Sequence, residues 1–149
     1  MPVCCSKLPP VKSDYVPEGQ TINIGDFEVY ETKDKTPNKV LICAYDIFGF
    51  HPVTKQVADR LALAGFRVVM PDFFRGKPWP QERYPPANYE DLFKWIGEVG
   101  AWEKTVKKDL LRVIKHYKEN ENIKAFGIYG FCWVIRKNSI YINLFYSKS

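Results

Sequence analysis

The sequence predicts an α/β fold, in which a mostly parallel sheet carries helices on both faces. A continuous apolar run at 40–45 is typical of a strand that is covered on both sides, and residues 66–70, Phe-Arg-Val-Val-Met, are predicted to form a second buried strand. A helical pattern lies between them, and two more helical stretches precede a third apolar run at 123–129. This alternation of strands and helices favours parallel pairing, which brings functional residues together at the carboxyl ends of the strands.

The segment before the first buried strand is predicted to contain an irregular arm and a hairpin. Residues 1–20 contain four prolines and show no hydrophobic periodicity, so we expect an arm without regular structure. Residues 21–24 and 27–31 alternate apolar and polar side chains around a Gly-Asp pair. That pattern is typical of a β-hairpin.

Helices and one long loop fill the intervals between the buried strands. The first helix is expected from Val53 to a glycine cap at Gly65. Residues 73–88 contain four prolines among aromatic side chains, and loops of this length are often functional. Two further helices are predicted near 89–99 and 101–118. The apolar face of the second consists of Trp102, Val106, Leu110, Val113 and Tyr117.

Length and composition exclude several classes of protein. A chain of 149 residues and 17.4 kDa has the size of one domain. Its 46% hydrophobic and 26% charged residues exclude a disordered chain, and no apolar run reaches the roughly 18 residues of a membrane span. The N-terminus lacks the pattern of a secretory signal peptide, so we expect a cytoplasmic protein with no membrane partner.

The charge distribution and the few metal-ligating residues predict neither a nucleic-acid partner nor a metal site. Three of the cations behind the net charge of +5 lie in the last sixteen residues, so the rest of the chain carries only +2 and no nucleic-acid partner is expected. No Cys-x-x-Cys pair occurs, and His51 and His116 are expected at a helix start and on a solvated helix face. We therefore expect no metal site. No Gly-x-Gly-x-x-Gly follows a strand, which disfavours a nucleotide-binding domain, and no cofactor is expected.

The third apolar run leads into Gly130-Phe131-Cys132-Trp133, which has two interpretations. A strand that ends in Gly-x-nucleophile and turns into a helix begins the nucleophile elbow of α/β-hydrolases. A cysteine suits the central position because its thiolate is a strong nucleophile. The full pattern has a small residue two positions later, where this chain has Val134. The alternative is a buried core cysteine among aromatic side chains.

Residues 46–49, Asp46-Ile47-Phe48-Gly49, follow the first buried strand and form a second candidate element. In such hydrolases, a backbone N–H of the loop after an early strand and the N–H of the residue after the nucleophile form the oxyanion hole. The donors would here be Ile47 and Trp133, with Asp46 near the thiol. In the alternative interpretation, Asp46 caps the following helix or forms a turn with Gly49.

Arg75 and the residues after the nucleophile complete the set of candidates. Arg75, which follows the second buried strand, could bind a substrate carboxylate through two hydrogen bonds. A surface arginine on a loop fits the spacing equally well. In α/β-hydrolases the triad acid and histidine follow the nucleophile in chain order. No Asp, Glu or His follows Cys132, so we expect negligible turnover by this chain.

Together, these motifs resemble the dienelactone hydrolase family, also called carboxymethylenebutenolidases. The resemblance rests on residues 46–52, 69–79 and 130–133, and the N-terminal Cys4-Cys5 is similar to the fungal branch of the family. It covers about residues 4–133, which correspond to the first half of a complete family member.

The resemblance implies an α/β-hydrolase fold, here truncated after the nucleophile strand, and hydrolysis of a small lactone or ester by a Cys-His-Asp triad without metal. Cys132 matches the nucleophile, and Ile47 and Trp133 match the oxyanion-hole donors. Asp46 matches a glutamate that helps to control the nucleophile in the bacterial enzymes. Arg75 matches an arginine that binds a substrate carboxylate. The Asp and His of the family triad have no counterpart in this chain.

The chain is thereby divided into the arm 1–20, the N-terminal half of a hydrolase-like domain at 21–133, and a tail at 134–149. Ten of the sixteen tail residues are Ile, Lys, Asn, Tyr or Phe, which A/T-rich codons encode, so we hypothesise that the tail is translated intron. The alternative for the tail is an amphipathic strand or helix. The alternative for the whole chain is a non-catalytic truncated product or a thiol-bearing binding domain.

Overall fold

The computed structural model describes residues 11–121 and 123–132, and each predicted strand and helix within them is present. Residues 11–19 contain no helix or strand. The main elements are β1 (Gln20–Ile24), β2 (Phe27–Glu31), β3 (Lys39–Ala44), α1 (Pro52–Leu63), β4 (Arg67–Pro71), α2 (Tyr89–Glu98), α3 (Lys107–Glu121) and β5 (Ala125–Gly130). None of the helices formed by the described residues is both long and apolar enough to span a bilayer.

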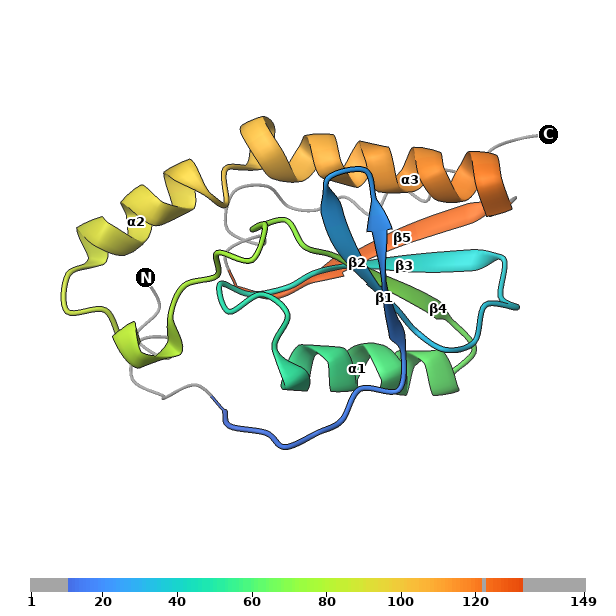
Figure 1. Ribbon diagram of the computed structural model, residues 1–149, viewed down its shortest axis with the longest axis horizontal. Coiled ribbons are helices and arrows are strands. Elements are labelled where there is room, and N and C mark those ends of the chain that lie inside the picture. Colours follow the sequence, from blue (N-terminus) through green and yellow to red (C-terminus); the bar gives the residue numbers. More distant parts are fainter. Residues whose placement is uncertain (1–10, 122, 133–149) are drawn as a thin grey trace.

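The strands form one sheet in the order β1-β2-β4-β3-β5. β3 lies in the middle of the parallel part and pairs with β4 on one side and β5 on the other. The hairpin of β1 and β2 extends this part, because β2 pairs antiparallel with β4. Figure 1 shows α1 and α3 on opposite sides of the sheet. The predicted α/β fold is confirmed: a parallel centre is extended by the antiparallel hairpin, with helices on both faces of the sheet.

Local signals in the sequence explain where the helices begin and end. His51 is the N-cap of α1, and its Nδ1 accepts a hydrogen bond from the N–H of Val53 at 3.3 Å. Pro52 occupies the first turn, where its missing N–H costs nothing. Gly65, with φ +91°, allows the chain to leave the helix in the left-handed conformation. The predicted role of His51 at a helix start is thus confirmed.

The last predicted helix begins differently from expectation. Trp102–Val106 form a π-helical turn, in which the carbonyl of Ala101 accepts hydrogen bonds from the N–H groups of both Thr105 (2.9 Å) and Val106 (3.3 Å). The regular helix α3 then runs to Glu121, three residues beyond the predicted end. A wide turn of this kind carries no clear signal in the hydrophobic period, which explains why the sequence predicts one helix through residues 101–106.

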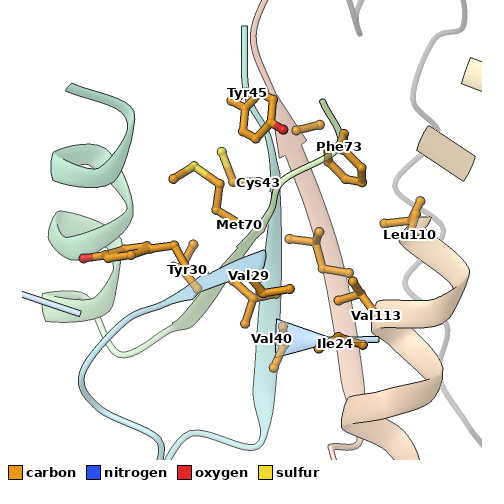
Figure 2. Close-up of a cluster of buried hydrophobic side chains, with 14 of the residues drawn as sticks. Ile24, Val29, Tyr30, Val40, Cys43, Tyr45, Met70, Phe73, Leu110 and Val113 are labelled. Carbon is orange, nitrogen blue, oxygen red and sulfur yellow. The ribbon is translucent and has the colours of Figure 1, made fainter. Parts of the chain in front are cut away.

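The core lies on both faces of the sheet. Figure 2 shows Tyr30 on the side of α1, and Leu110 and Val113 of α3 on the opposite side. Val29 and Val113 are fully buried. Removing such side chains from water is the main source of stability in a fold of this size.

A buried carboxylate, Asp59 of α1, fixes the arm to the body of the protein. It accepts hydrogen bonds from the hydroxyls of Tyr15 (2.8 Å) and Tyr30 (2.7 Å) and from the N–H of Glu18 (3.1 Å). Burial and the hydrogen bond to Asp59 raise the pKa of Tyr15 to about 12, so this hydroxyl remains a donor at neutral pH.

A second buried carboxylate, Glu31 at the end of β2, joins three elements. It forms an ion pair with Arg67 of β4 at 3.0 Å, and the Tyr117 hydroxyl of α3 donates to it. Arg67 is itself 1% exposed and also pairs with Glu121 at 2.6 Å. Lys35 reaches Glu31 from the solvent side at 2.9 Å. Both charges of the Glu31–Arg67 pair are buried, and Glu121 and Lys35 add to their compensation.

Candidate active site at the carboxyl ends of the parallel strands

Cys132 has the backbone conformation of a strained turn. It follows β5 after one intervening residue, its φ is +63°, and it is exposed. A positive φ costs a non-glycine residue about 1–3 kcal/mol, so it is uncommon. A strained, exposed residue just after the end of a parallel strand is the local geometry of a nucleophile elbow. The alternative of a buried core cysteine is therefore wrong for Cys132.

The pairing of β5 with β3 brings Cys132 to the edge where the Ile47 loop begins. The register runs to Gly130 opposite Ala44, and the N–H of Phe131 donates to the carbonyl of Ala44 at 3.1 Å. Residues 45–47 follow Ala44 directly, and Figure 1 shows the two strands adjacent. The elbow and the predicted oxyanion loop therefore leave the sheet from neighbouring strands at the same edge.

The peptide between Asp46 and Ile47 is held by a tight turn. The Asp46 carbonyl accepts from the N–H of Gly49 at 3.2 Å, and the Asp46 carboxylate accepts from the N–H of Phe48 at 2.9 Å. Gly49 has φ +69°, which suits glycine. Since C=O and N–H of one trans peptide point in opposite directions, the Ile47 N–H points away from the Asp46–Gly49 hydrogen bond.

These contacts decide between the two alternatives for Asp46. Its carbonyl closes a turn with Gly49 and its carboxylate accepts from Phe48 within that turn, while the cap of α1 is His51, so the prediction of a helix cap at Asp46 is wrong. Burial raises the pKa of Asp46, although the N–H of Phe48 and the nearby His51 oppose the shift. The side chain is thus a half-buried acid whose protonated form is favoured relative to an exposed aspartate.

Arg75 has a buried carboxylate partner within the protein. Its Nη1 and Nη2 donate to the two oxygens of Asp109 at 2.7 and 2.9 Å, and its guanidinium lies 4.6 Å from the centre of the Phe27 ring. These hydrogen bonds raise the pKa of Arg75. Arg75 therefore joins the hairpin, the loop after β4 and α3, and it is more than a solvated surface arginine. A substrate carboxylate would have to replace Asp109 or share Arg75 with it.

The sequence patterns did not identify Asp109 as that partner. Asp109 is 4% exposed and lies three residues after Val106 and four before Val113, on the apolar face of α3. An acidic residue at helical spacing within an apolar stripe is the signal that could have revealed a buried ion pair.

Cys43 and His116 lie in structural positions, within a strand and on a helix. Cys43 is buried in β3, and burial raises the pKa of its thiol to about 12, so it remains protonated at neutral pH. His116 lies on α3 beside Asn120 and against the Tyr117 ring. Among the described residues, no three His, Cys, Asp or Glu side chains cluster in a way that would hold a metal ion.

Other predicted features lie outside the described residues. They include Trp133, the second expected oxyanion donor, the Cys4-Cys5 pair and the tail at 134–149.

Comparison with known sequences identifies relatives over most of the chain. Residues 27–134 match the model of the dienelactone hydrolase family. A carboxymethylenebutenolidase homolog of Xenopus tropicalis is 34% identical over 125 residues, which are 82% of this chain and 48% of the relative. An uncharacterised AIM2 family protein of Schizosaccharomyces pombe is 34% identical over 128 residues, covering 80% of this chain and 49% of that protein. The chain thus spans about half the length of the curated relatives it matches.

A solved structure supports the fold. The crystal structure of a candidate dienelactone hydrolase from Klebsiella pneumoniae superposes with a TM-score of 0.54 and 23% identity, over 72% of this chain and 45% of that one. The agreement extends the sequence match to the arrangement of strands and helices, which is that of an α/β-hydrolase. By sequence and by fold, the chain belongs to the dienelactone hydrolase family.

Proposed function

We propose that this chain carries the acyl-accepting part of a cysteine-dependent ester or lactone hydrolase, with Cys132 as the nucleophile. The observation that carries the proposal is the positive φ of Cys132 at the end of β5, beside the turn that holds the Ile47 peptide. The family match supports a small-molecule ester or lactone as the substrate class.

The proposed reaction begins with attack of the Cys132 thiolate on the carbonyl carbon of the substrate. A C–S bond forms, and the electron pair of the C=O double bond moves to oxygen, giving an oxyanion. The N–H groups of Ile47 and Trp133 are the proposed donors to that oxygen. When the C=O bond re-forms, the C–O bond to the leaving group breaks. The departing alkoxide takes a proton from water, and the acyl group remains on Cys132 as a thioester.

Two further residues are proposed to act at the edge of this site. Asp46, as a half-buried acid beside the oxyanion turn, would disfavour a permanent thiolate at Cys132 when ionised and permit one when protonated. Arg75 would attract a substrate carboxylate, in competition with Asp109. Both roles follow the family pattern, and the half-buried position of Asp46 beside the turn supports the first of them.

The test uses p-nitrophenyl acetate, an activated ester whose leaving group is coloured. We expect the chain to release a burst of p-nitrophenolate that approaches one equivalent, since one thiol lies at the elbow. Cys132→Ala is expected to lose this burst. Cys43→Ala is the matched control, because a buried thiol with a pKa of about 12 does not react, and it should keep the burst.

A burst that is equal in the wild type and in Cys132→Ala would overturn the proposal. Alkylation of Cys132 by iodoacetamide without any acylation by the ester would favour the thiol-bearing binding domain instead.

A further inference from the structure

The loop after β4 supports the oxyanion turn through the backbone. The N–H of Trp79 donates to the carbonyl of Ile47 at 2.8 Å, across 32 residues of sequence. A Cβ placed on Gly49 would lie 3.2 Å from the Cβ of Pro78, so the two loops are in close contact at this point. The position of Ile47, and through it of the peptide that carries its N–H, therefore depends on the position of residues 72–79.

Asp72, at the start of that loop, is the residue that shapes it. One carboxylate oxygen accepts from the N–H of Gly76 at 2.7 Å, and the other accepts from the N–H of Phe74 at 3.3 Å. Its backbone carbonyl accepts from the N–H of Arg75 at 3.2 Å. Asp72 is 9% exposed, so these bonds form in a largely desolvated environment, where each is strengthened.

Tyr45 closes the connection back to the oxyanion turn. It is fully buried, lies two residues before Ile47, and its hydroxyl donates to Asp72 at 3.2 Å. Its ring packs against Phe73 at 5.7 Å and Phe74 at 5.0 Å between ring centres. Figure 2 shows Tyr45 and Phe73 close together at one end of the core. The 72–79 loop is thus connected to the oxyanion turn at two points: Asp72 binds Tyr45, and Trp79 binds Ile47.

We propose that Asp72 is a positioning residue that holds the Ile47 peptide in place to stabilise the oxyanion. This inference rests on the proposed acylation of Cys132. Asp72 itself acts through the loop and touches neither thiol nor ester. Its loss should therefore slow reactions that form an oxyanion and leave unchanged a reaction of the same thiol that forms none.

The experiment measures two rates at Cys132 by peptide mass spectrometry. Acylation by p-nitrophenyl acetate passes through an oxyanion, whereas alkylation by iodoacetamide is a displacement at saturated carbon and does not. Asp72→Asn replaces one acceptor oxygen by an NH₂ donor. We expect acylation to fall about 10- to 100-fold, because displacing a catalytic group by about 1 Å has an effect of that size. Alkylation should change less than about 3-fold.

Two further variants provide a second test of the same loop and a matched control. Tyr45→Phe removes a single hydroxyl and should lower acylation in the same direction, by a smaller factor. Asp59→Asn is the matched control, because it also converts a buried, tyrosine-bound carboxylate to an amide, but on α1 and without contact to residues 72–79. It should leave the ratio of acylation to alkylation unchanged.

The outcomes separate this inference from the proposed function. If wild-type Cys132 is alkylated but never acylated, the proposed function fails. If wild-type Cys132 is acylated and Asp72→Asn retains the same ratio of acylation to alkylation, the positioning role of Asp72 is wrong while the nucleophile stands. Equal loss of both rates in Asp72→Asn would show general damage to the fold and would also contradict the positioning role.

Discussion

The 149-residue polypeptide, assayed by itself, is expected to release one equivalent of product from an activated ester and then almost stop. Hydrolysis of the thioester needs a base that activates water, and no His, Asp or Glu follows Cys132 in this sequence. His51 caps α1 and His116 lies on α3 beside Asn120, so we expect neither histidine to act as the base for Cys132. Loss of the triad base in hydrolases lowers the rate by about 10⁴- to 10⁶-fold.

The measurement is p-nitrophenolate release over hours after the burst. The steady rate, corrected for Cys132→Ala, should be more than about 10³-fold slower than the burst, in line with the loss of a triad base. Free imidazole is a useful control, since added base should speed release of the acyl group. A sustained, Cys132-dependent turnover as fast as the burst would show that another group in this chain supplies the base.

Glu31→Gln is expected to lower the free energy of unfolding by about 3 kcal/mol, the lower end of the range for a broken buried ion pair, because it removes one of the two carboxylates that compensate the buried Arg67. Tyr117 would also lose a carboxylate acceptor. Chemical denaturation at pH 7 measures this change. Glu28→Gln, on the same strand but exposed, is the control and should change stability by less than about 0.5 kcal/mol.

The same carboxylate predicts how stability depends on pH. Burial alone would raise the pKa of Glu31, but hydrogen bonds from Lys35, Tyr117 and Arg67 outweigh it and lower the pKa to about 2, from an ordinary 4.5. A carboxyl whose pKa is lower in the folded chain stabilises the fold above its unfolded pKa. This contribution is complete above pH 4.5 and is lost as the pH falls towards 2.

Denaturation between pH 5 and pH 2 checks the direction. The wild type should lose stability through this interval, and Glu31→Gln should lose less, so the two curves should approach one another in acid. A constant difference between them down to pH 2 would show that ionisation of Glu31 does not contribute to stability.

Strands and helices were predictable from the sequence where the pattern of apolar residues follows the burial of the side chains. Residues 40–45 are apolar throughout and residues 66–70 are apolar except for Arg67, because helices cover both faces of the sheet, and these patterns predicted β3 and β4. The alternation at 21–31 predicted a hairpin, but it carried no information on which edge the hairpin joins. The antiparallel pairing of β2 with β4 depends on tertiary contacts that no local pattern encodes.

The site was predictable where it has a motif. Gly130-Phe131-Cys132 and Asp46-Ile47-Phe48-Gly49 match a motif in which particular residue types accompany a turn, and the structure gives Cys132 and Gly49 a positive φ. The support of Ile47 by Trp79 uses a backbone N–H and carbonyl, which any residue type can supply. Partnerships of this kind leave no side-chain signature in the sequence, and only the folded chain shows them.

The identity of the acylated residue distinguishes most directly between a nucleophile elbow and an inert thiol. The chain would be mixed with p-nitrophenyl acetate, quenched in acid and digested, and each peptide would be weighed by mass spectrometry. We predict one acetyl group per chain, on the peptide that contains Cys132, formed within the burst. Acetyl groups on Cys4-Cys5 or on lysines, with Cys132 unmodified at the end of the burst, would contradict the assignment of Cys132 as the nucleophile.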